Sequence, residues 1–253
     1  AYDASLHSVG SQWSVTFSVD GTGTPLAGEP KQIRYGANPT AGIMTTLDSR
    51  IQRICESAGS GLEKGCIVVM DVESGDILGL ASFPGYSADS LGDAVSDPDS
   101  PMIQRALYAY PVGSIFKLVT TAAALETIPD AQQLQFTCTG KTVIGGQEII
   151  CMGNHGTISM SQALAHSCNV YYGELAAKVG RDALQRTCDK LGLNGTLSCD
   201  GYKARSTVDL SDADEGSVAW AGIGQYTDQV TALQFLRFMG VIAGGGEAAE
   251  PYL

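Results

Sequence analysis

The chain has 253 residues, of which 44% are hydrophobic and 17% charged, and this composition fits one globular domain with a buried core and at most a small attachment. A formal net charge of −12 argues against nucleic-acid binding, because phosphate backbones are bound by clustered lysine and arginine side chains. No window of about 20 apolar residues is present, and residues 1–25 are polar and glycine-rich, so neither a membrane span nor a signal peptide is expected.

The first 44 residues lack helical periodicity and contain many glycines and prolines. Residues 13–19 alternate between apolar and polar types, which predicts a short strand followed by a linker. The pattern then changes, because Asp48 precedes an amphipathic repeat that runs to about Ala58 and predicts a helix capped by this carboxylate. We therefore expect a lead-in segment over residues 1–44 and a folded domain over residues 45–253.

Residues 65–71 and 76–82 are apolar runs joined by an Asp-x-x-Ser-Gly-Asp turn, which predicts an antiparallel hairpin. Runs as apolar as these indicate strands covered by helices. Strands are also expected on both sides of the turn at Gly145 and Gly146. Together these elements predict an α/β fold of the layered α+β type with antiparallel strands. The helices expected in the second half of the chain cover residues 114–126, 159–166, 168–179, 181–191 and 231–243.

Seven cysteines are present, and none belongs to a C-x-x-C arrangement, which argues against a structural zinc site. Six of them form pairs that are close in sequence, and such pairs are typical of disulfides in an oxidising compartment. Sequence does not define connectivity, and small buried thiols in a reduced protein are the alternative interpretation. The pairs are Cys55/Cys66, Cys138/Cys151 and Cys188/Cys199, with Cys168 left over.

The first candidate for chemistry is the segment Tyr110-Pro-Val-Gly-Ser-Ile-Phe-Lys117. Ser114 at a helix start and Lys117 three residues later share one helix face. A serine hydroxyl becomes nucleophilic when a base removes its proton, and an amine is that base only when neutral. Lowering a lysine pKa from ~10.4 to near 7 corresponds to about 4–5 kcal/mol, and burial and a helix N-terminus both favour it. Alone, S-x-x-K is a weak signal, because a helix cap followed by a surface lysine has the same spacing.

A second triplet, Ser167-Cys168-Asn169, lies about fifty residues downstream. Its hydroxyl and its amide are two positions apart and can project into one cleft. Ser167 can relay a proton between Lys117 and a leaving group. Asn169 can hold the lysine and donate a hydrogen bond to a substrate amide. Alone, this triplet is more simply interpreted as a helix cap.

In this order and spacing, the two triplets resemble those of the active-site serine family of penicillin-recognising enzymes, and the wider chain resembles penicillin-binding protein transpeptidases. The resemblance covers about residues 45–253. The further segments that carry it are Thr46–Asp48, Val68–Asp71, Ser74-Gly75, Ala81–Tyr86, Arg105-Ala106, Gly153–Gly156, Ala163–Ala165, Ile223–Gln225 and Thr231–Gln234.

The resemblance implies an antiparallel sheet flanked by helices, as in penicillin-binding proteins and serine β-lactamases, with the active site between the sheet edge and a helical subdomain. It implies a peptidoglycan D,D-transpeptidase in which Ser114 attacks the penultimate D-alanyl carbonyl of a stem peptide and expels the terminal D-alanine. A neighbouring stem amine then receives the acyl group. β-Lactams are expected to acylate the same serine.

By the same resemblance, the catalytic residues are Ser114, Lys117, Ser167 and Asn169, and no metal or organic cofactor is implied. The expected partners are peptidoglycan stem peptides, β-lactam antibiotics and other cell-wall synthesis proteins, with no nucleic acid. The expected location is extracytoplasmic, with the protein anchored to the membrane through a segment outside this chain.

The third motif of the family, K-T-G, is absent, since the only candidate, Lys141-Thr142-Val143, lacks the glycine and precedes the second triplet. We expect the strand that carries it to lie beyond Leu253, in a segment missing from a truncated chain; a separate chain and a degenerate relative are the alternatives. A smaller departure is Tyr226, where the family often has glycine. Two other functions stay open: a non-catalytic β-lactam sensor or binding module, and a serine β-lactamase, for which no deacylating glutamate motif is recognisable.

Overall fold

The computed structural model describes residues 43–253 and, before them, residues 13–16, 18–20, 22, 24 and 31–34. The chain divides into two compact units, residues 1–45 and 46–253. In the first unit, β1 (Trp13–Thr16) pairs with β2 (Lys31–Arg34) in antiparallel register. The strand predicted over residues 13–19 is therefore confirmed for its first four residues. Phe17 and most of the predicted linker lie outside the described residues.

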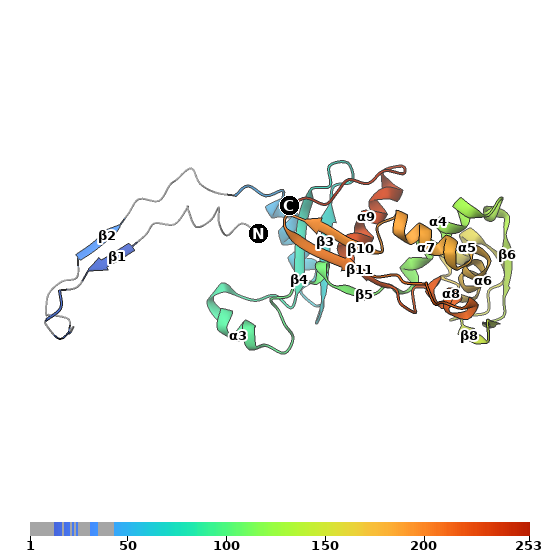
Figure 1. Ribbon diagram of the computed structural model, residues 1–253, viewed down its shortest axis with the longest axis horizontal. Coiled ribbons are helices and arrows are strands. Elements are labelled where there is room, and N and C mark those ends of the chain that lie inside the picture. Colours follow the sequence, from blue (N-terminus) through green and yellow to red (C-terminus); the bar gives the residue numbers. More distant parts are fainter. Residues whose placement is uncertain (1–12, 17, 21, 23, 25–30, 35–42) are drawn as a thin grey trace. The chain divides into compact units, whose positions relative to one another are not determined.

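The second unit contains an antiparallel hairpin between two helices (Figure 1). Its strands confirm the hairpin predicted over residues 65–82, and its side chains alternate between two faces. Val69 and Ala81 pack on one face together with Cys55 of the preceding helix, whereas Leu80 packs on the other face together with Leu233. Both faces are covered, which explains the apolar runs. These elements are α2 (Ser49–Ala58), β3 (Gly65–Met70), β4 (Ile77–Phe83) and α9 (Ala232–Ala243).

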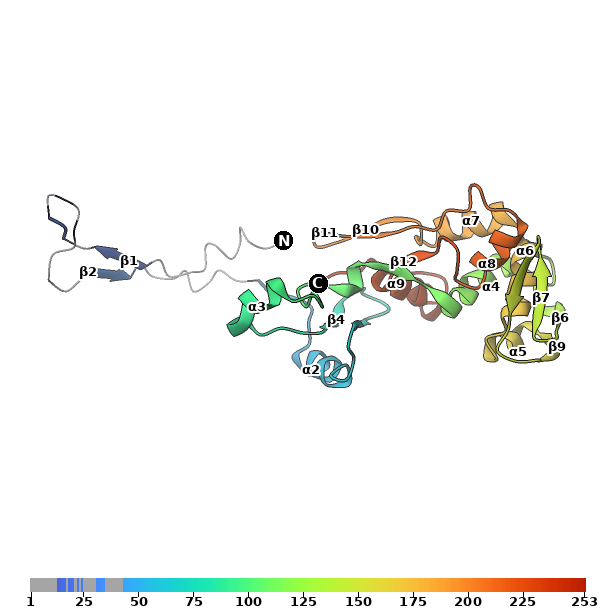
Figure 2. The ribbon, with the colours of Figure 1, turned by 90° about the horizontal axis from the view of Figure 1, so that it is seen from below.

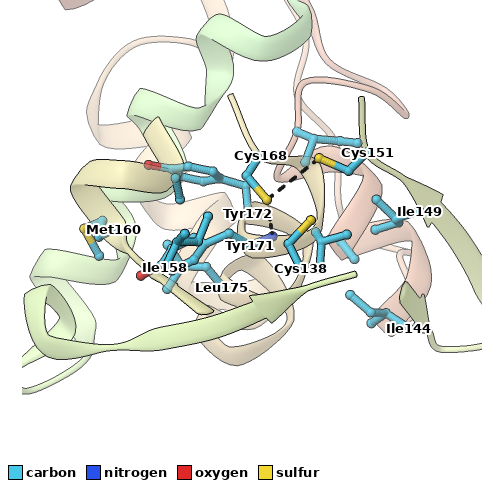
Figure 3. Packing of buried hydrophobic residues seen from close by; sticks show 14 of the residues in the cluster. Cys138, Ile144, Ile149, Cys151, Ile158, Met160, Cys168, Tyr171, Tyr172 and Leu175 are labelled. Atoms are coloured by element: carbon cyan, nitrogen blue, oxygen red, sulfur yellow. Dashed lines mark hydrogen bonds between the residues drawn. The ribbon is translucent and has the colours of Figure 1, made fainter. Parts of the chain in front are cut away.

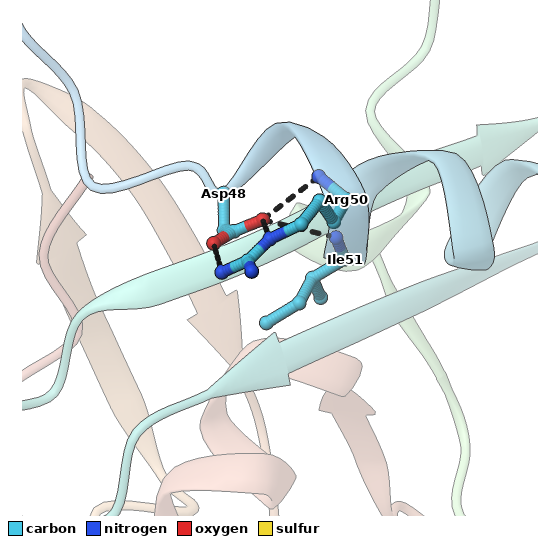
Figure 4. Close-up of polar contacts among 3 residues, drawn as sticks. All are labelled: Asp48, Arg50 and Ile51. Atoms are coloured by element: carbon cyan, nitrogen blue, oxygen red, sulfur yellow. Dashed lines mark hydrogen bonds and ion pairs between the residues drawn. The ribbon is translucent and has the colours of Figure 1, made fainter.

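The predicted cap of α2 is confirmed in detail (Figure 4). The Asp48 carboxylate accepts hydrogen bonds from the backbone N–H groups of Arg50, at 2.8 Å, and Ile51, at 3.3 Å. It also pairs with the Arg50 guanidinium at 2.7 Å. The guanidinium and these N–H groups together hold the pKa of the Asp48 carboxyl well below its ordinary value of 3.8. A short polar side chain before an amphipathic repeat thus begins the helix where the sequence predicts.

A helical subdomain follows, made of α4 to α8 with β6 to β9, and Figures 1 and 2 both show it grouped away from the β3–β4 hairpin. The predicted helices are confirmed within one or two residues at most ends, although the first of them begins with a 3₁₀ turn, η3 (Gly113–Phe116). Its helices are α4 (Lys117–Thr127), α5 (Met160–Ala165), α6 (Asn169–Val179), α7 (Arg181–Lys190) and α8 (Glu215–Ala221). Its strands are β6 (Gln135–Cys138), β7 (Lys141–Ile144), β8 (Gln147–Ile150) and β9 (Gly156–Ser159).

The sequence analysis missed several short elements. The helix α8 spans seven residues, and β6 and β9 are four residues each and pair across an intervening hairpin, β7–β8. Strands this short have no local pattern that separates them from loops. The others are η1 (Ala88–Ser90), α3 (Leu91–Ser96), η2 (Arg105–Leu107), β5 (Ala109–Pro111), η4 (Ala131–Gln133), β10 (Gly195–Cys199), β11 (Tyr202–Ser206) and β12 (Gln229–Thr231).

The strands of the described residues form six antiparallel pairs of two strands each. The antiparallel strands flanked by helices that the resemblance implied are present, with the β3–β4 hairpin lying between α2 and α9. Two isolated bridges are also present, an antiparallel one between Thr207 and Gln229 and a parallel one between Asp76 and Tyr252. Beside the second bridge, the Ile77 N–H donates to the Tyr252 carbonyl at 2.7 Å. The last residues of the chain thus run beside the start of β4. None of the helices in the described part of the chain is both long and apolar enough to cross a lipid bilayer.

The helix α6 is the centre of the helical subdomain, and it carries the two largest fully buried side chains, Tyr171 and Tyr172. The Tyr171 hydroxyl donates to the Leu134 carbonyl at 3.0 Å. The Tyr172 hydroxyl lies 2.9 Å from Thr121 Oγ1 on α4. Both phenol hydroxyls are therefore satisfied inside an apolar core. The second of these contacts fixes α6 against α4, the two helices that carry the candidate catalytic triplets.

All seven cysteines are free thiols in the structure, and six of them are buried. None of the three sequence-local pairs is a disulfide, so the structure agrees with the alternative interpretation, buried thiols. Cys168, which was left over from these pairs, lies close to another cysteine. Its sulfur lies 3.8 Å from the sulfur of Cys151, because the N-terminus of α6 packs against the end of β8.

Asp228, just before β12, is a buried carboxyl group with 1% of its surface exposed. Neither of its side-chain oxygens has a hydrogen-bond partner among the described residues. Burial raises the pKa of Asp228 from 3.8 to about 8, because the charged form loses its hydration. The folded protein therefore keeps a proton on this group at pH values where the unfolded chain has released it.

Because Asp228 keeps its proton in the folded protein, we expect the free energy of unfolding to depend on pH. Between about pH 5 and pH 8 the unfolded chain binds fewer protons than the folded one, so the free energy of unfolding falls as pH rises, by on the order of 4 kcal/mol. Asp228→Asn removes this contribution and should flatten the curve, whereas Asp212→Asn, which changes an exposed side chain, should leave it unchanged. Urea denaturation of the three proteins across this range measures the difference. Parallel curves for wild type and Asp228→Asn would refute the buried proton.

Candidate active site

Ser114 lies in the 3₁₀ turn that leads into α4, directly after Gly113, whose φ of +65° favours glycine. The Gly113 N–H donates to the Gly224 carbonyl at 2.9 Å. Gly224 has a φ of +79°, and a Cβ at this position would collide with the Gly113 backbone. Tyr226, where the related family often has glycine, adopts a φ of +77°, a region that a residue with a side chain rarely occupies. The loop between α8 and β12 thus holds the turn that carries Ser114 through backbone contacts.

The structure brings all four predicted site residues together around one nitrogen atom. Lys117 is fully buried, with 0% of its surface exposed, whereas Ser114 is exposed. Lys117 Nζ lies 3.1 Å from Ser114 Oγ and 2.9 Å from Ser167 Oγ. It also lies 2.7 Å from Asn169 Oδ1 and 2.7 Å from the Ser167 carbonyl oxygen. The two triplets, fifty residues apart, therefore meet at one polar centre.

The hydrogen-bond partners of Lys117 are compatible with a neutral amine. Two of them, the Ser167 carbonyl and Asn169 Oδ1, can only accept hydrogen bonds, and they use two N–H bonds. A neutral amine has no further N–H, and its lone pair remains for a hydroxyl that donates to it. The Ser114 and Ser167 hydroxyls are both within reach of that lone pair. A charged ammonium has three N–H bonds for four acceptors and gains no carboxylate partner at this position.

Burial lowers the pKa of Lys117 from 10.5 to about 8, although the nearby sulfurs of Cys151 and Cys168 favour the charged form. The ring of Tyr172 lies 5.9 Å from Nζ and forms part of the apolar wall around the amine. With a pKa near 8, an appreciable fraction of the lysine is neutral at physiological pH. This value suits a general base, which acts best when its pKa is close to the working pH.

Ser167 and Asn169 are held by contacts that the sequence analysis did not find. Ser167 has a φ of +51°, an unusual conformation for a residue with a side chain, and such strain is often found at functional sites. Asn169 is the first residue of α6, and its Nδ2 donates to the Ile150 carbonyl at 2.9 Å. This bond turns Oδ1 of Asn169 toward Lys117. The end of β8 therefore orients the amide, and no sequence signal near Asn169 reveals it.

The weak K-T-G candidate has a different role. Lys141 and Thr142 lie on β7, where Lys141 Nζ pairs with Glu148 Oε1 at 2.7 Å and Thr142 Oγ1 donates to Glu174 at 2.7 Å. Both contacts stay within β7, β8 and α6. Neither residue therefore belongs to the polar centre around Lys117.

A family model described as the penicillin binding protein transpeptidase domain matches residues 65–253. Among curated proteins, the peptidoglycan D,D-transpeptidase PbpA of Mycolicibacterium smegmatis is 28% identical over 247 residues, covering 86% of this chain and 49% of that protein. PbpA of Mycobacterium tuberculosis is 29% identical over 248 residues, with the same shares of 86% and 49%. The chain thus spans about half the length of the curated relatives it matches.

Solved structures agree with this match. The penicillin G acyl-enzyme complex of penicillin-binding protein A from M. tuberculosis superposes with a TM-score of 0.75 at 28% identity, covering 83% of this chain and 53% of that one. The D,D-transpeptidase domain of a peptidoglycan glycosyltransferase from Eggerthella lenta gives a TM-score of 0.77 at 26% identity, covering 95% of this chain and 68% of that one.

Proposed function

Because the chain belongs to the penicillin-binding protein transpeptidase domain family, we propose that it is the acyl-transfer part of a peptidoglycan D,D-transpeptidase, with residues 45–253 as its catalytic domain. The observation that carries this proposal is the 3.1 Å contact between Lys117 Nζ and Ser114 Oγ, together with burial that lowers the pKa of Lys117 to about 8. An exposed alcohol beside a buried neutral base is the arrangement that serine acyl transfer requires.

In the acylation step, the Ser114 hydroxyl proton passes to Lys117 Nζ as Oγ bonds to the carbonyl carbon of the penultimate D-alanine. The C–N bond to the terminal D-alanine then breaks, and the leaving amine takes a proton from Lys117 through the Ser167 hydroxyl, 2.9 Å from Nζ. The product is an ester on Ser114, and free D-alanine departs.

In the second step, an amine of a neighbouring stem peptide attacks the ester carbonyl and loses a proton to Lys117. The C–O bond to Ser114 breaks, and the serine oxygen regains its proton. Asn169 holds Lys117 in place through Oδ1 throughout both steps. A β-lactam presents an amide in a strained ring to the same serine, and the ester formed persists because the ring fragment stays attached.

This function defines the partners and the location. The substrates are peptidoglycan stem peptides that end in D-Ala-D-Ala, the inhibitors are β-lactam antibiotics, and other cell-wall synthesis proteins are expected beside it. An extracytoplasmic position, with a membrane anchor outside this chain, follows from the position of the peptidoglycan. The penicillin G acyl-enzyme complex of a relative that is 28% identical supports the β-lactam assignment.

The test uses the full natural protein with a stem-peptide analogue that ends in D-Ala-D-Ala and an added amine acceptor, followed by mass spectrometry. We expect D-alanine release together with incorporation of the acceptor. Release without incorporation would identify a D,D-carboxypeptidase. Rapid hydrolysis of a penicillin would identify a β-lactamase, and a stable penicillin adduct without peptide turnover would identify a sensor. Each of these last three results would overturn the transpeptidase assignment.

A further inference from the structure

Four side chains with metal-binding atoms meet beside the second candidate triplet, whose middle residue, Cys168, is one of them. Cys138, Cys151, His155 and Cys168 each offer one ligand atom, and these four atoms all lie within 4.8 Å of one another. The residues come from the end of β6, the residue after β8, the residue before β9 and the residue before α6. Figure 3 shows the three sulfur atoms pointing toward one another at the edge of the buried core. We name these four residues the sulfur cluster.

The distances in the sulfur cluster fit a tetrahedral zinc ion. Zinc binds thiolate sulfur at about 2.3 Å and imidazole nitrogen at about 2.0–2.1 Å, so a tetrahedron has edges of about 3.8 Å between two sulfurs and about 3.6 Å between sulfur and nitrogen. The Cys151 and Cys168 sulfurs are 3.8 Å apart, and Cys151 Sγ is 3.7 Å from His155 Nδ1. These two distances match the edges of a zinc tetrahedron, and the other distances between ligand atoms, all within 4.8 Å, need to shorten by at most about 1 Å.

The surroundings shield the cluster and place one of its sulfurs at a helix N-terminus, although burial raises the pKa of that thiol, Cys168. Cys168 caps α6, and its sulfur accepts a hydrogen bond from the Tyr171 N–H at 3.4 Å, at the positive end of the helix. Cys138 and Cys168 are buried, with 1% and 0% of their surfaces exposed. His155 is half-buried, and its ring stacks on His166 at a centroid distance of 5.1 Å. The cluster is thus shielded from water on the cysteine side and reachable on the histidine side.

We propose that Cys138, Cys151, His155 and Cys168 bind one zinc ion in a tetrahedral site with three sulfur ligands and one nitrogen ligand. Each thiol gives its proton to solvent as its sulfur binds the ion, while the neutral imidazole binds through one ring nitrogen. Four protein ligands complete the coordination shell and leave no position for substrate, so the ion is structural. Soft thiolates select zinc over magnesium or calcium, which prefer oxygen ligands.

Because the sulfur cluster lies next to the second triplet, a bound ion would help to position the candidate active-site residues. Cys168 stands between Ser167 and Asn169, and Cys151 follows Ile150, whose carbonyl orients the Asn169 amide. An ion held by both cysteines would tie the end of β8 to the start of α6. The ion itself is a positioning element, since none of its ligands contacts Ser114. Zinc binding as such does not depend on the proposed transpeptidase function.

The first test measures metal content. The full natural protein, purified under reducing conditions without chelator, should contain about one zinc per chain by elemental mass spectrometry. Cys138→Ser, Cys151→Ser, Cys168→Ser and His155→Ala should each lose most of it. Cys188→Ser is the matched control, because Cys188 is equally buried but lies in another cluster of the core, and it should keep the zinc. Zinc below about 0.1 per chain after reconstitution, or zinc kept by all four variants, would overturn the proposal.

The second test does not depend on the folding of variants. Cobalt(II) added to metal-free wild-type protein should produce thiolate charge-transfer bands and the d–d bands of a tetrahedral site, and added zinc should abolish them. Bands typical of octahedral cobalt, or none, would overturn the proposal. A disulfide between Cys138 and Cys151 in the natural protein, seen by mass spectrometry under non-reducing conditions, would overturn it as well.

The third test addresses positioning. Removal of zinc by a chelator should slow acylation by penicillin on the order of 10-fold to 100-fold, since a small displacement of catalytic groups has effects of this size. Added zinc should restore the rate. Equal rates for the zinc-loaded and zinc-free protein would refute the link to the active site. Because metal content is measured separately, a protein that binds zinc but never reacts with penicillin would refute only the proposed function.

Discussion

Ser114→Ala should abolish the covalent adduct between the protein and a labelled penicillin, as seen by intact-mass spectrometry. Ser114 is exposed, and its hydroxyl oxygen lies 3.1 Å from a buried amine whose pKa is lowered to about 8. Without the serine oxygen, no ester can form with the β-lactam carbonyl. Release of D-alanine from a stem-peptide analogue should fall to the background rate for the same reason.

The control for this substitution is Ser161→Ala, which removes an exposed hydroxyl from α5. It should keep both the adduct and the peptide reaction. Circular dichroism and thermal unfolding should be similar for Ser114→Ala and the wild type, because Ser114 is exposed and lies outside the core. An adduct that persists in Ser114→Ala at the wild-type rate would show that another residue is the nucleophile.

Lys117→Met should slow acylation by about 10²–10⁴-fold, the usual contribution of a general base. Methionine fills a similar volume in the buried site but has no lone pair of sufficient basicity. Lys117→Arg should be equally slow, because a guanidinium stays protonated at any working pH. Lys178→Met, on the exposed end of α6, is the matched control and should react at the wild-type rate.

The pH dependence of the same reaction tests the protonation state of Lys117. Its pKa is lowered from 10.5 to about 8, so the neutral fraction grows as pH rises. The rate of acylation should therefore increase with pH up to about 8 and level off above it. Stopped-flow fluorescence with a reporter β-lactam measures this profile. A flat profile across this range, or full activity in Lys117→Arg, would exclude the lysine as the base.

The stability of Lys117→Met is expected to be close to that of the wild type, or higher, at neutral pH. A buried lysine with a lowered pKa costs folding free energy wherever the unfolded chain is protonated and the folded one resists protonation. This cost is relieved as pH rises from about 8 toward 10.5, because the unfolded chain then binds more protons than the folded one. A catalytic base of this kind is thus kept at the expense of stability.

The sequence by itself determined the features that depend on neighbouring residues. The Asp48 cap, the β3–β4 hairpin and the helical spacing of Ser114 and Lys117 each arise within a few residues, where backbone geometry and side-chain type decide the structure. The family resemblance also followed from sequence, because it rests on the order of short motifs. These patterns were sufficient to name Ser114, Lys117, Ser167 and Asn169 as candidates.

Only the tertiary structure decided how distant segments meet. The orientation of Asn169 by the Ile150 carbonyl, the burial of Asp228 and the gathering of Cys138 with Cys168 join residues that share no local pattern. Each depends on how α6 packs against strand ends or how a loop is enclosed by the core. Such contacts are set by the sum of many weak packing interactions, so the absence of a C-x-x-C arrangement did not exclude a metal site built from four separate segments.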